Sequence, residues 1–265
     1  MSQSSVYART TLSDRQIAWL HQVVNEGQLI ADLAFADIVV WAATPAGSFV
    51  AMSHLRPSSA VTLFYRDLVE SPIRPEWLPI VLEAYQKGII IDLPGSEHHD
   101  DGRTRVRAVP IRAFGDNSSK SGQVIAVLTR HSNMSEPRIP SRQELTFDEC
   151  ANDLFSMIAE GSFPNQDSPG SPTRGAPRAS DGLIRLDVGA RVSFASPNAL
   201  SAFRRMGFQQ ELEGAALAEV TASLISGTLS VDEALPLVVT GRAPWRSDIE
   251  NAGVTITLRA IPVSR

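Results

Sequence analysis

The sequence predicts an α+β fold in two domains, each an antiparallel sheet with flanking helices. Three observations predict it: strand-like alternation grouped into hairpins, amphipathic helices around these groups, and one Pro/Gly/Ser-rich segment that divides the chain. A chain of 265 residues has room for two domains of the common size, roughly 100–150 residues each. We place the first domain at residues 13–161, a linker at 162–180 and the second domain at 181–265.

Composition limits the classes of protein that this chain can belong to. Its 43% hydrophobic and 20% charged residues are typical of a globular chain, and its net charge of -5 predicts no direct binding to nucleic acid. We expect no membrane contact, because no apolar run approaches the roughly 20 residues that cross a bilayer and residues 1–12 lack a signal peptide. Cys150 is the only cysteine, which excludes an internal disulfide and favours a cytoplasmic protein.

An amphipathic helix is expected at each end of the first domain. The first helix begins at about Ser13, whose hydroxyl can pair with Gln16 in a capping box, and the last helix covers residues 143–161. The residues on the two apolar faces are Ile17, Leu20, Val23, Val24, Ile30 and Ala31 in the first helix, and Phe147, Cys150, Leu154, Phe155 and Ile158 in the last.

Between these helices the apolar pattern changes to that of a sheet. The expected elements are a hairpin of residues 38–43 and 49–55, a helix of residues 77–87 that ends at Gly88, and a hairpin of residues 105–114 and 123–130. Helices packed on one side of this antiparallel sheet would give an α+β domain.

The second domain follows a segment with four prolines, residues 162–180, which is too polar to form a core. A strand is expected at residues 183–188 and another at 192–195. Ser196 then precedes Pro197 as the N-cap of a helix, since proline is favoured at the first helical position.

These segments resemble a known family of sensor proteins. Residues 181–220 resemble the start of a PAS domain, and SFASPNALSAFRRMG with ELEG behind it resembles the PAS region of actinobacterial two-component sensor histidine kinases of the PdtaS type. The blocks GQLIADLAFADIVVW at 27–41, QVIAVLTRH at 123–131 and MIAEGSFP at 157–164 resemble the same family, and the order of elements in the first domain resembles a GAF domain.

The resemblance implies that this chain is the N-terminal sensor region of such a kinase, a GAF-like domain followed by a PAS-like domain. It would bind a small ligand or repack its dimer and so control autophosphorylation of a kinase core absent from this chain. It also implies a homodimer that pairs through the first and last GAF helices, and a response regulator with an RNA-binding antitermination domain as partner. Three alternatives stay open: the helices only cover their own sheet, the chain is a ligand-free dimerisation or scaffolding module, or it is a small-molecule enzyme, which would need convergent polar groups in a cleft.

The end of the sequence departs from the PAS pattern. Residues 244–250 and 254–263 alternate like two late strands, whereas a PAS sheet has a further strand. We expect a PAS-like domain that lacks its last strand, either as the sensory half of a longer kinase or as a separate sensor with a shortened sheet.

The sequence gives no support for catalysis by this chain. It has no phosphoacceptor histidine in a basic, asparagine-rich helix, no glycine-rich nucleotide motif and no motif of the G-x-S-x-G or H-E-x-x-H type. We therefore expect this chain not to be an enzyme, although the full-length parent that it resembles would be a histidine protein kinase. No cofactor is identifiable, and an unknown small ligand is the expected input.

Arginine and aromatic residues near the sheet are the candidate ligand-binding residues. The cavity of a GAF-like domain lies between the sheet and the loops that cross it, where a buried guanidinium would bind a phosphate or carboxylate bidentately. The favoured candidates are Arg56, Trp41, Tyr65, Arg107 and Arg130, with Arg103, Arg105 and Phe64 as further members of this set. The alternative is that the arginines lie at the surface and the aromatic residues belong to the core.

Two further groups are weaker candidates. His98 and His99, in the loop Glu97–Asp101, are weak candidates for a metal site, and a solvated loop is the favoured alternative. Cys150 falls on the apolar side of the last helix, where a buried thiol is unreactive, so a structural role is favoured over a redox role.

Overall fold

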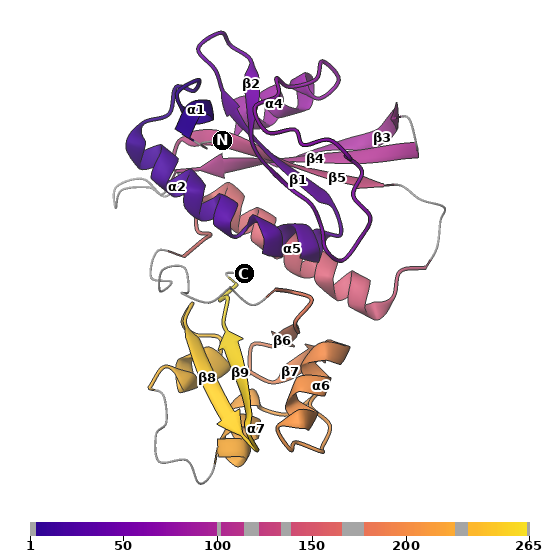
Figure 1. Cartoon of the computed structure of the whole chain (residues 1–265), viewed down its shortest axis with the longest axis vertical. Helices are drawn as coiled ribbons and strands as arrows, with labels where there is room; N and C mark the ends of the chain where they lie inside the picture. The colour runs from indigo at the N-terminus through magenta and orange to yellow at the C-terminus, as the bar shows by residue number, and fades with distance from the viewer. Residues whose placement is uncertain are drawn as a thin grey trace. The chain divides into compact units, whose positions relative to one another are not determined.

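The computed structural model describes residues 4–99, 102–113, 122–133, 139–165, 178–225 and 233–263. It divides into two compact units, residues 1–164 and 165–265 (Figure 1). Each unit combines helices with antiparallel strands, which confirms the predicted α+β class.

The first unit is built on a five-stranded antiparallel sheet with the order β2-β1-β5-β4-β3 (Figure 1). Its strands are β1 (Asp37–Ala43), β2 (Phe49–Leu55), β3 (Ile91–His99), β4 (Gly102–Arg112) and β5 (Val124–Asn133). The predicted hairpins are β1 with β2 and β4 with β5, although Phe114 lies outside the described residues.

Strand β3 was missed from the sequence, because Pro94 and the charged residues after it interrupt the apolar alternation. It pairs with β4 from Ile91 opposite Ala108 to His99 opposite Gly102, with a register shift after Leu93. The prediction of a loop at Glu97–Asp101 is therefore wrong for residues 97–99, which are strand, whereas residues 100–101 lie outside the described part of the chain.

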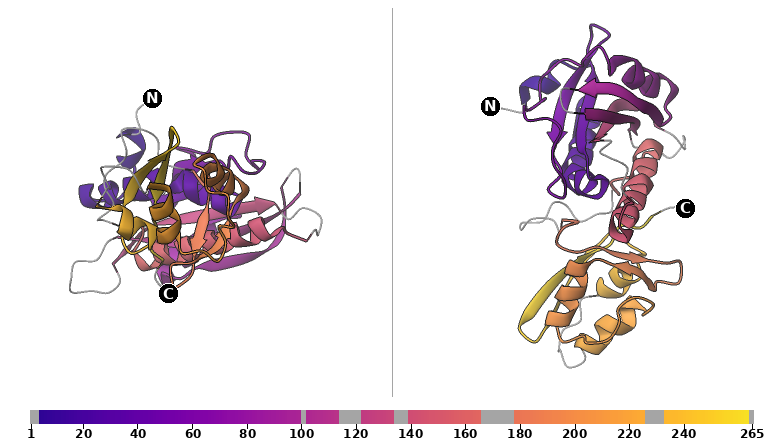
Figure 2. Two further views of the ribbon diagram at one scale, coloured as in Figure 1. Left: turned by 90° about the horizontal axis from the view of Figure 1, so that it is seen from below. Right: turned by 90° about the vertical axis from the view of Figure 1, so that its right-hand side faces the viewer.

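Helices cover both faces of this sheet (Figures 1 and 2). The helices α2 (Asp14–Asn25), α3 (Gly27–Ala34) and α5 (Arg142–Glu160) lie on one face, and α4 (Leu78–Lys87) lies on the other. A short helix, α1 (Ser4–Tyr7), contacts β2. The prediction that the helices pack on one side of the sheet is wrong, because α4 buries its apolar side against the face opposite to α5.

The predicted helix boundaries follow the capping residues. The Ser13 side chain accepts a hydrogen bond from the Gln16 N–H, and the Gln16 side chain accepts one from the Ser13 N–H, which confirms the capping box. Gly88 ends α4 with a positive φ of 64°, a conformation that favours glycine. The first predicted helix is two helices in the structure, since Glu26 is both the C-cap of α2 and the N-cap of α3.

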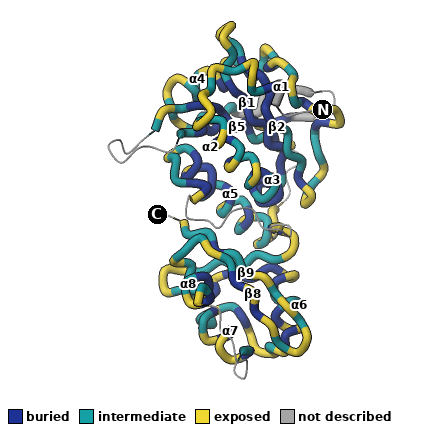
Figure 3. Tube along the Cα trace, turned by 60° about the vertical axis from the view of Figure 1, so that its left-hand side comes forward, coloured by how far each residue is buried: buried dark blue, intermediate teal, exposed yellow. Residues whose placement is uncertain are grey.

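The apolar faces of α2, α3 and α5 are buried within the first unit of a single chain (Figure 3). The buried apolar residues include Trp19, Leu20, Val23, Ile30, Ala31 and Leu33 on α2 and α3, and Phe147, Ala151, Leu154, Phe155, Met157 and Ile158 on α5, whereas Ile17 and Val24 are half-buried. Their periodicity is thus explained by the cover that they give their own sheet. A dimer through these helices would have to use their other residues.

Arg112, at the end of β4, joins the ends of two helices. Its guanidinium donates to three main-chain carbonyls: Nε to Ala159 at 2.8 Å, Nη1 to Gly122 at 2.9 Å and Nη2 to Gly88 at 2.8 Å. Ala159 and Gly88 lie at the C-terminal ends of α5 and α4, where unpaired carbonyls carry partial negative charge. The Arg112 carbonyl accepts from Trp19 Nε1 at 2.8 Å, so Arg112 also connects α2 to the end of β4.

The second unit contains two separate two-stranded antiparallel sheets and three helices among its described residues. Ser196 caps its first helix by accepting from the Ala199 N–H, as predicted. The elements are β6 (Ile184–Leu186), β7 (Val192–Ala195), α6 (Pro197–Arg205), α7 (Leu217–Ile225), α8 (Leu235–Val239), β8 (Arg246–Asn251) and β9 (Val254–Arg259). They enclose a core of their own that includes Phe203, Met206, Leu212, Val220 and Ile249.

None of the helices in the described part of the chain has both the length and the apolar character that a membrane-spanning helix needs.

Replacing Arg112 by Ala should lower the free energy of unfolding of the first unit by about 2–4 kcal/mol, because three main-chain carbonyls lose a charged donor. Chemical unfolding followed by tryptophan fluorescence measures this loss. Arg66→Ala is the matched control, since Arg66 is exposed and its removal should change stability by less than about 0.5 kcal/mol. Equal effects of the two substitutions would show that Arg112 does not hold the helix ends.

Candidate functional site

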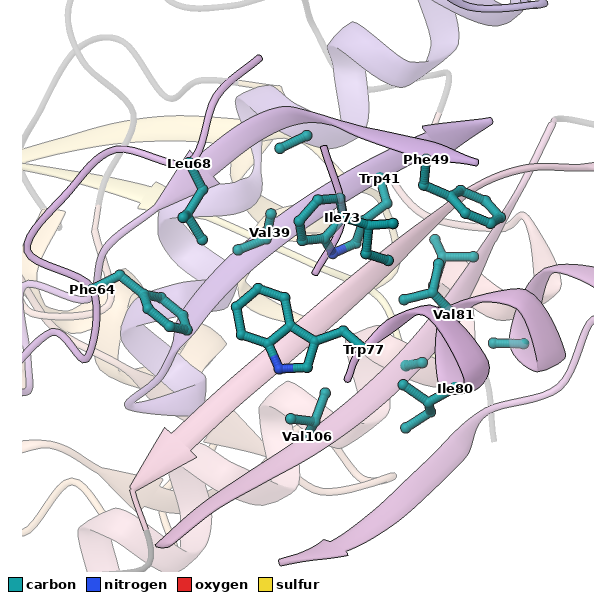
Figure 4. Packing of buried hydrophobic residues seen from close by; sticks show 14 residues of the cluster. Val39, Trp41, Phe49, Phe64, Leu68, Ile73, Trp77, Ile80, Val81 and Val106 are labelled. Atoms are coloured by element: carbon teal, nitrogen blue, oxygen red, sulfur yellow. The ribbon is translucent and has the colours of Figure 1, made fainter. Parts of the chain in front are cut away.

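A buried polar cluster lies on the sheet face that α4 covers, which we call the inner face. Residues 56–77, between β2 and α4, form the crossing segment that closes this face (Figure 4). The segment contributes Phe64, Leu68, Ile73 and Trp77 to the inner-face core, and residues 70–73 hydrogen bond to β2. The polar cluster lies where this segment meets the sheet.

Asp37, the first residue of β1, is the centre of the cluster. Its side chain is fully buried. Oδ1 accepts from Thr62 Oγ1 at 2.6 Å and from His54 Nε2 at 3.2 Å, and Oδ2 accepts from the Leu63 N–H at 2.6 Å. Since Thr62 and Leu63 belong to the crossing segment and His54 to β2, one carboxylate fastens the crossing segment to two strands.

The Asp37 carboxyl is held in its charged form. Burial is the largest single influence and raises its pKa, but hydrogen bonds from His54, Thr62 and the Leu63 N–H, together with the electrostatic effect of His54, outweigh it. The pKa of Asp37 therefore lies below its ordinary value of 3.8. A buried, charged and fully hydrogen-bonded carboxylate is costly to leave without its partners.

His54 links this carboxylate to the next part of the crossing segment. The Leu68 N–H donates to His54 Nδ1 at 3.4 Å, so Nδ1 is an acceptor and the ring proton is assigned to Nε2, which donates to Asp37. Asp67 Oδ1 lies 3.6 Å from the same Nδ1. The His54 side chain is fully buried, whereas the Asp67 side chain is 63% exposed.

A second carboxylate fastens the start of the crossing segment to α3. Asp32 is fully buried, and its Oδ1 accepts from the Ser58 N–H at 2.6 Å, from Ser58 Oγ at 2.9 Å and from Gln28 Nε2 at 3.0 Å. The Asp32 carbonyl also accepts from Ser59 Oγ at 2.7 Å. The crossing segment is thus tied to α3 at its start and to the sheet a few residues later.

A second polar chain crosses the inner face beside Asp37. Trp41 Nε1 donates to Thr129 Oγ1 at 2.8 Å, and Thr129 Oγ1 lies 2.8 Å from His131 Nε2 and donates to the Val39 carbonyl at 3.3 Å. Thr129 and His131 are fully buried. Hydrogen bonds therefore orient the Trp41 and His131 rings toward the crossing segment.

Aromatic rings from the sheet and the crossing segment fill the space between them (Figure 4). The Trp77 ring centroid lies 4.6 Å from that of His131 and 6.0 Å from that of Trp41, and Phe64 lies 5.1 Å from His131 and 5.5 Å from Trp77. The Arg74 guanidinium lies 4.8 Å from the Trp77 ring centroid. Any molecule that reached this face would have to displace these side chains.

The predicted ligand-binding residues separate into two groups. Trp41 lies in the inner-face core, and Arg56 is half-buried beside it at the start of the crossing segment, where its Nε donates to the Phe64 carbonyl at 3.2 Å. Tyr65 is 83% exposed, contrary to the expectation that it lines an interior cavity, because the chain turns its neighbour Phe64 inward instead.

Arg107 and Arg130 lie on the opposite face, which α5 covers. Arg107 binds both carboxylate oxygens of Asp92, at 2.6 Å and 3.1 Å, and its Nη1 donates to Asn152 on α5. Arg130 Nη1 lies 2.7 Å from Asp148 Oδ1, also on α5. These two arginines hold α5 on the sheet, so the structure does not bring them to one site with Trp41 and Arg56.

The weaker candidates gain no support from the described residues. His98 and His99 belong to β3, but their side chains lie outside the described part of the structure, as does that of Arg103. The described side chains contain no group of three or more His, Cys, Asp and Glu residues that could hold a metal ion. Cys150 is half-buried on α5, rather than fully buried as expected.

The central residues of the cluster were not identified from the sequence. Strand pairing brings Asp37, His54 and His131 together, and the path of the crossing segment adds Thr62. One signal was available: Asp37 interrupts the apolar run of β1, and a charged residue inside such a run is rarely buried without a partner.

The chain is similar to known sensor kinases along nearly its whole length. Residues 3–151 match the family described as histidine kinase PdtaS, GAF domain. Sensor histidine kinase PdtaS of Mycolicibacterium smegmatis is 38% identical over 262 residues, which cover 96% of this chain and 50% of that protein. The protein of the same name from Mycobacterium tuberculosis is 38% identical over 271 residues, covering 96% of this chain and 51% of that protein. The chain thus spans about half the length of the curated relatives it matches.

A solved structure is similar to this chain over 99% of its length. It is described as the sensor region of a sensor histidine kinase, and it superposes with a TM-score of 0.78 and 34% sequence identity, covering 99% of this chain and 91% of that chain.

Replacing Asp37 by Asn should lower the free energy of unfolding by about 1–3 kcal/mol at pH 7, because an amide nitrogen cannot accept from the Leu63 N–H. The native protein should lose stability as the pH falls below 3.8 toward the lower folded-state pKa, because the unfolded chain then binds the proton more readily. The variant should lose less over this window. Chemical unfolding between pH 2.5 and pH 7 measures both effects.

Asp148→Asn is the matched control for this prediction. It removes a half-exposed carboxylate that pairs with Arg130, so it should cost no more than about 1 kcal/mol. If the Asp37 variant kept the full acid dependence of the native protein, the buried carboxylate would not be the group that titrates.

Proposed function

The chain belongs to the histidine kinase PdtaS family and forms the sensory region of such a kinase, and we propose that it controls autophosphorylation of a kinase core outside this chain. The input is the binding of a small ligand, or a repacking of the dimer, in the first unit. This unit would be a GAF-like sensor domain at residues 13–161, joined by the linker 162–180 to a PAS-like domain at 181–265.

The observation that carries this proposal is the fastening of the crossing segment to the sheet by Asp37. The inner face is filled by Trp41, Phe64 and Trp77, so a ligand can reach it only when the crossing segment moves. The hydrogen bonds from Thr62 and Leu63 to Asp37 are the contacts that such a movement breaks. Binding a ligand and releasing the crossing segment are therefore one event, which shifts a population between two states.

Arg56 is the residue we propose to meet an anionic ligand group. It lies half-buried at the start of the crossing segment and already contacts Phe64 through its Nε. A phosphate or carboxylate that displaced the Phe64 carbonyl would gain a charged donor at the edge of the inner face. Arg107 and Arg130 are less suited to this role, since they pair with Asp92 and Asp148 on the other face.

A path from the inner face to the output runs through Arg112. A movement of α4 would shift the position of the Gly88 carbonyl. The same Arg112 guanidinium donates to this carbonyl and to the carbonyl of Ala159 near the end of α5. Since α5 leads into the linker at residue 162, this contact supports a route toward the PAS-like domain. That domain would relay the signal, and its two strand pairs, β6 with β7 and β8 with β9, are compatible with a PAS sheet that lacks its last strand.

We further propose a cytoplasmic homodimer. Its partner would be a response regulator with an RNA-binding antitermination domain, reached through the kinase core, without direct contact of this chain with nucleic acid or membrane. The filled inner face also favours the second candidate function, a dimerisation or scaffolding module that binds no ligand. The two candidates differ in whether the contacts of the crossing segment affect the output.

A chimera in which this chain replaces the matching half of the Mycolicibacterium smegmatis relative should autophosphorylate with labelled ATP. Thr62→Val in the chimera should change the initial rate by about 5-fold or more, because it removes a hydrogen bond between the crossing segment and Asp37, and coupling between sites typically spans 5- to 150-fold. Thr255→Val, at an exposed position of β9, is the matched control and should leave the rate unchanged.

Other outcomes separate the candidate functions. An inactive chimera, whose isolated parts are folded, would contradict the proposal that this chain controls a kinase core. An active chimera with equal rates for the Thr62 and Thr255 variants would favour the ligand-free module, since the inner face would then have no part in the output.

The chain should be a dimer of twice 28.7 kDa by light scattering at micromolar concentration. Leu145→Glu should shift it to the monomer, because Leu145 is 51% exposed on α5, one of the helices proposed to pair. Val61→Glu is the matched control: Val61 is 85% exposed, but it lies on the crossing segment and should leave the mass unchanged. A monomeric native chain, or a dimer that both substitutions leave intact, would rule out pairing through this part of α5.

A further inference from the structure

The ring of His54 has two possible partners for one nitrogen. In the structure Nδ1 accepts from the Leu68 N–H at 3.4 Å, while Asp67 Oδ1 lies 3.6 Å away. A neutral imidazole can accept at Nδ1, whereas a protonated imidazole donates from both nitrogens. Protonation of Nδ1 would therefore place two N–H groups, of His54 and of Leu68, against each other. The nearby Asp67 carboxylate would then be the better hydrogen-bond partner for Nδ1.

We propose that His54 is a proton-dependent switch for the crossing segment, so that the proton is an input of this sensory region. The neutral ring holds the Leu68 N–H, and the protonated ring releases it and forms an ion pair with Asp67. Histidine is suited to this exchange because its charge ordinarily changes between pH 5 and pH 8. The proposal rests on the proposed function only in taking the crossing segment as the sensing element.

Carboxylates on two elements favour the protonated ring. Asp37 on β1 accepts from Nε2 in both states, because Nε2 carries a proton whether the ring is neutral or charged. Asp67 on the crossing segment, already 3.6 Å from Nδ1, gains a hydrogen bond from it only in the charged state. The hydrogen bond from Nε2 to Asp37 thus keeps the ring in place, while Nδ1 changes its partner from the Leu68 N–H to Asp67.

Other groups around the ring oppose its charge. The His54 side chain is fully buried, which disfavours any charged form. Phe64 packs edge-on against His54 at 5.8 Å between ring centroids, and Phe64 is itself contacted by His131, Arg56 and Arg74. The Phe64 ring separates these three residues from His54, and the two arginines are positively charged. Groups of the same cluster therefore stabilise the neutral form of the His54 ring as well as its charged form.

The exchange would reach the core through residues 67–69. Asp67 Oδ1 accepts from the Val69 N–H at 3.1 Å, which forms a tight turn, and an ion pair with His54 would compete for this oxygen. Leu68, between these two residues, is buried in the inner-face core. Loss of its N–H bond and opening of the turn would together loosen the packing of Leu68 against the inner face.

The test is a pH titration of the whole chain, labelled with 15N, between pH 8 and pH 5. The His54 ring nitrogens should report an Nε2–H tautomer at high pH, and the Leu68 amide should shift with the same midpoint as the His54 ring. Asp67→Asn should lower this midpoint, because an amide stabilises the charged ring less than a carboxylate does. His54→Gln should abolish the transition at Leu68.

His21→Gln is the matched control, since the His21 ring lies against Tyr7, with 4.6 Å between ring centroids and the rings tilted by 42°, away from this cluster, and its loss should leave the Leu68 transition in place. A Leu68 amide that stays unchanged while His54 titrates, or a His54 ring that does not titrate between pH 5 and pH 8, would overturn the proposal. Persistence of the transition in the His54 variant would overturn it as well, and would point to His131. If His54→Gln does not fold, the Asp67→Asn variant still tests the proposal, because the midpoint of the Leu68 transition should fall and an unchanged midpoint would contradict the switch.

The kinase chimera separates this switch from the proposed function. Suppose that the titration establishes the switch at Leu68. Both proposals are then supported if the rate of autophosphorylation changes with pH in the chimera that carries His54 and changes less in the chimera with His54→Gln. An identical pH dependence in the two chimeras leaves the switch as a property of the protein and contradicts its role as an input to the kinase.

Discussion

The fastening of the crossing segment to β1 by the Asp37 carboxylate is the contact on which the inner face of the first unit depends. The carboxylate is buried, charged and bound by three donors from two elements, so its loss leaves donors at His54 and Leu63 without a partner. Because the crossing segment carries Phe64 and Trp77, its position decides where the aromatic rings pack. The Asp37 contact thus acts together with the Asp32 contact and the main-chain hydrogen bonds of residues 70–73 to β2 in holding the crossing segment over the filled core.

Two further polar contacts connect this face to the helices. Asp32 ties the start of the crossing segment to α3, and Arg112 ties the end of α4 to the end of α5. Each contact joins elements that lie on opposite faces of the same sheet. The route that we propose from the inner face to α5 uses these contacts, because closely packed elements move between discrete positions rather than deform freely.

The distribution of charge separates structural arginines from the candidate sensory ones. Arg107 and Arg130 form ion pairs with Asp92 and Asp148 that hold the strands and α5 together. Arg56 and Arg74, in contrast, lie beside Phe64 on the inner face. The inner face therefore combines carboxylates, histidines and arginines around aromatic rings. Our two proposals, an anionic ligand at Arg56 and a proton on His54, both place a change of charge within this mixture.

The sequence by itself determined the α+β class, the family, both predicted hairpins and the helix boundaries at Ser13, Gly88 and Ser196, because alternation and capping are local properties of a few neighbouring residues. It missed β3, an edge strand whose proline and charges hide the alternation, and it grouped arginines that the sheet separates onto opposite faces. Only the tertiary structure decided that Asp37, His54 and Thr62 form one cluster. The physical reason is that strand register and the path of the crossing segment bring these residues together, and both depend on contacts between residues far apart in the chain.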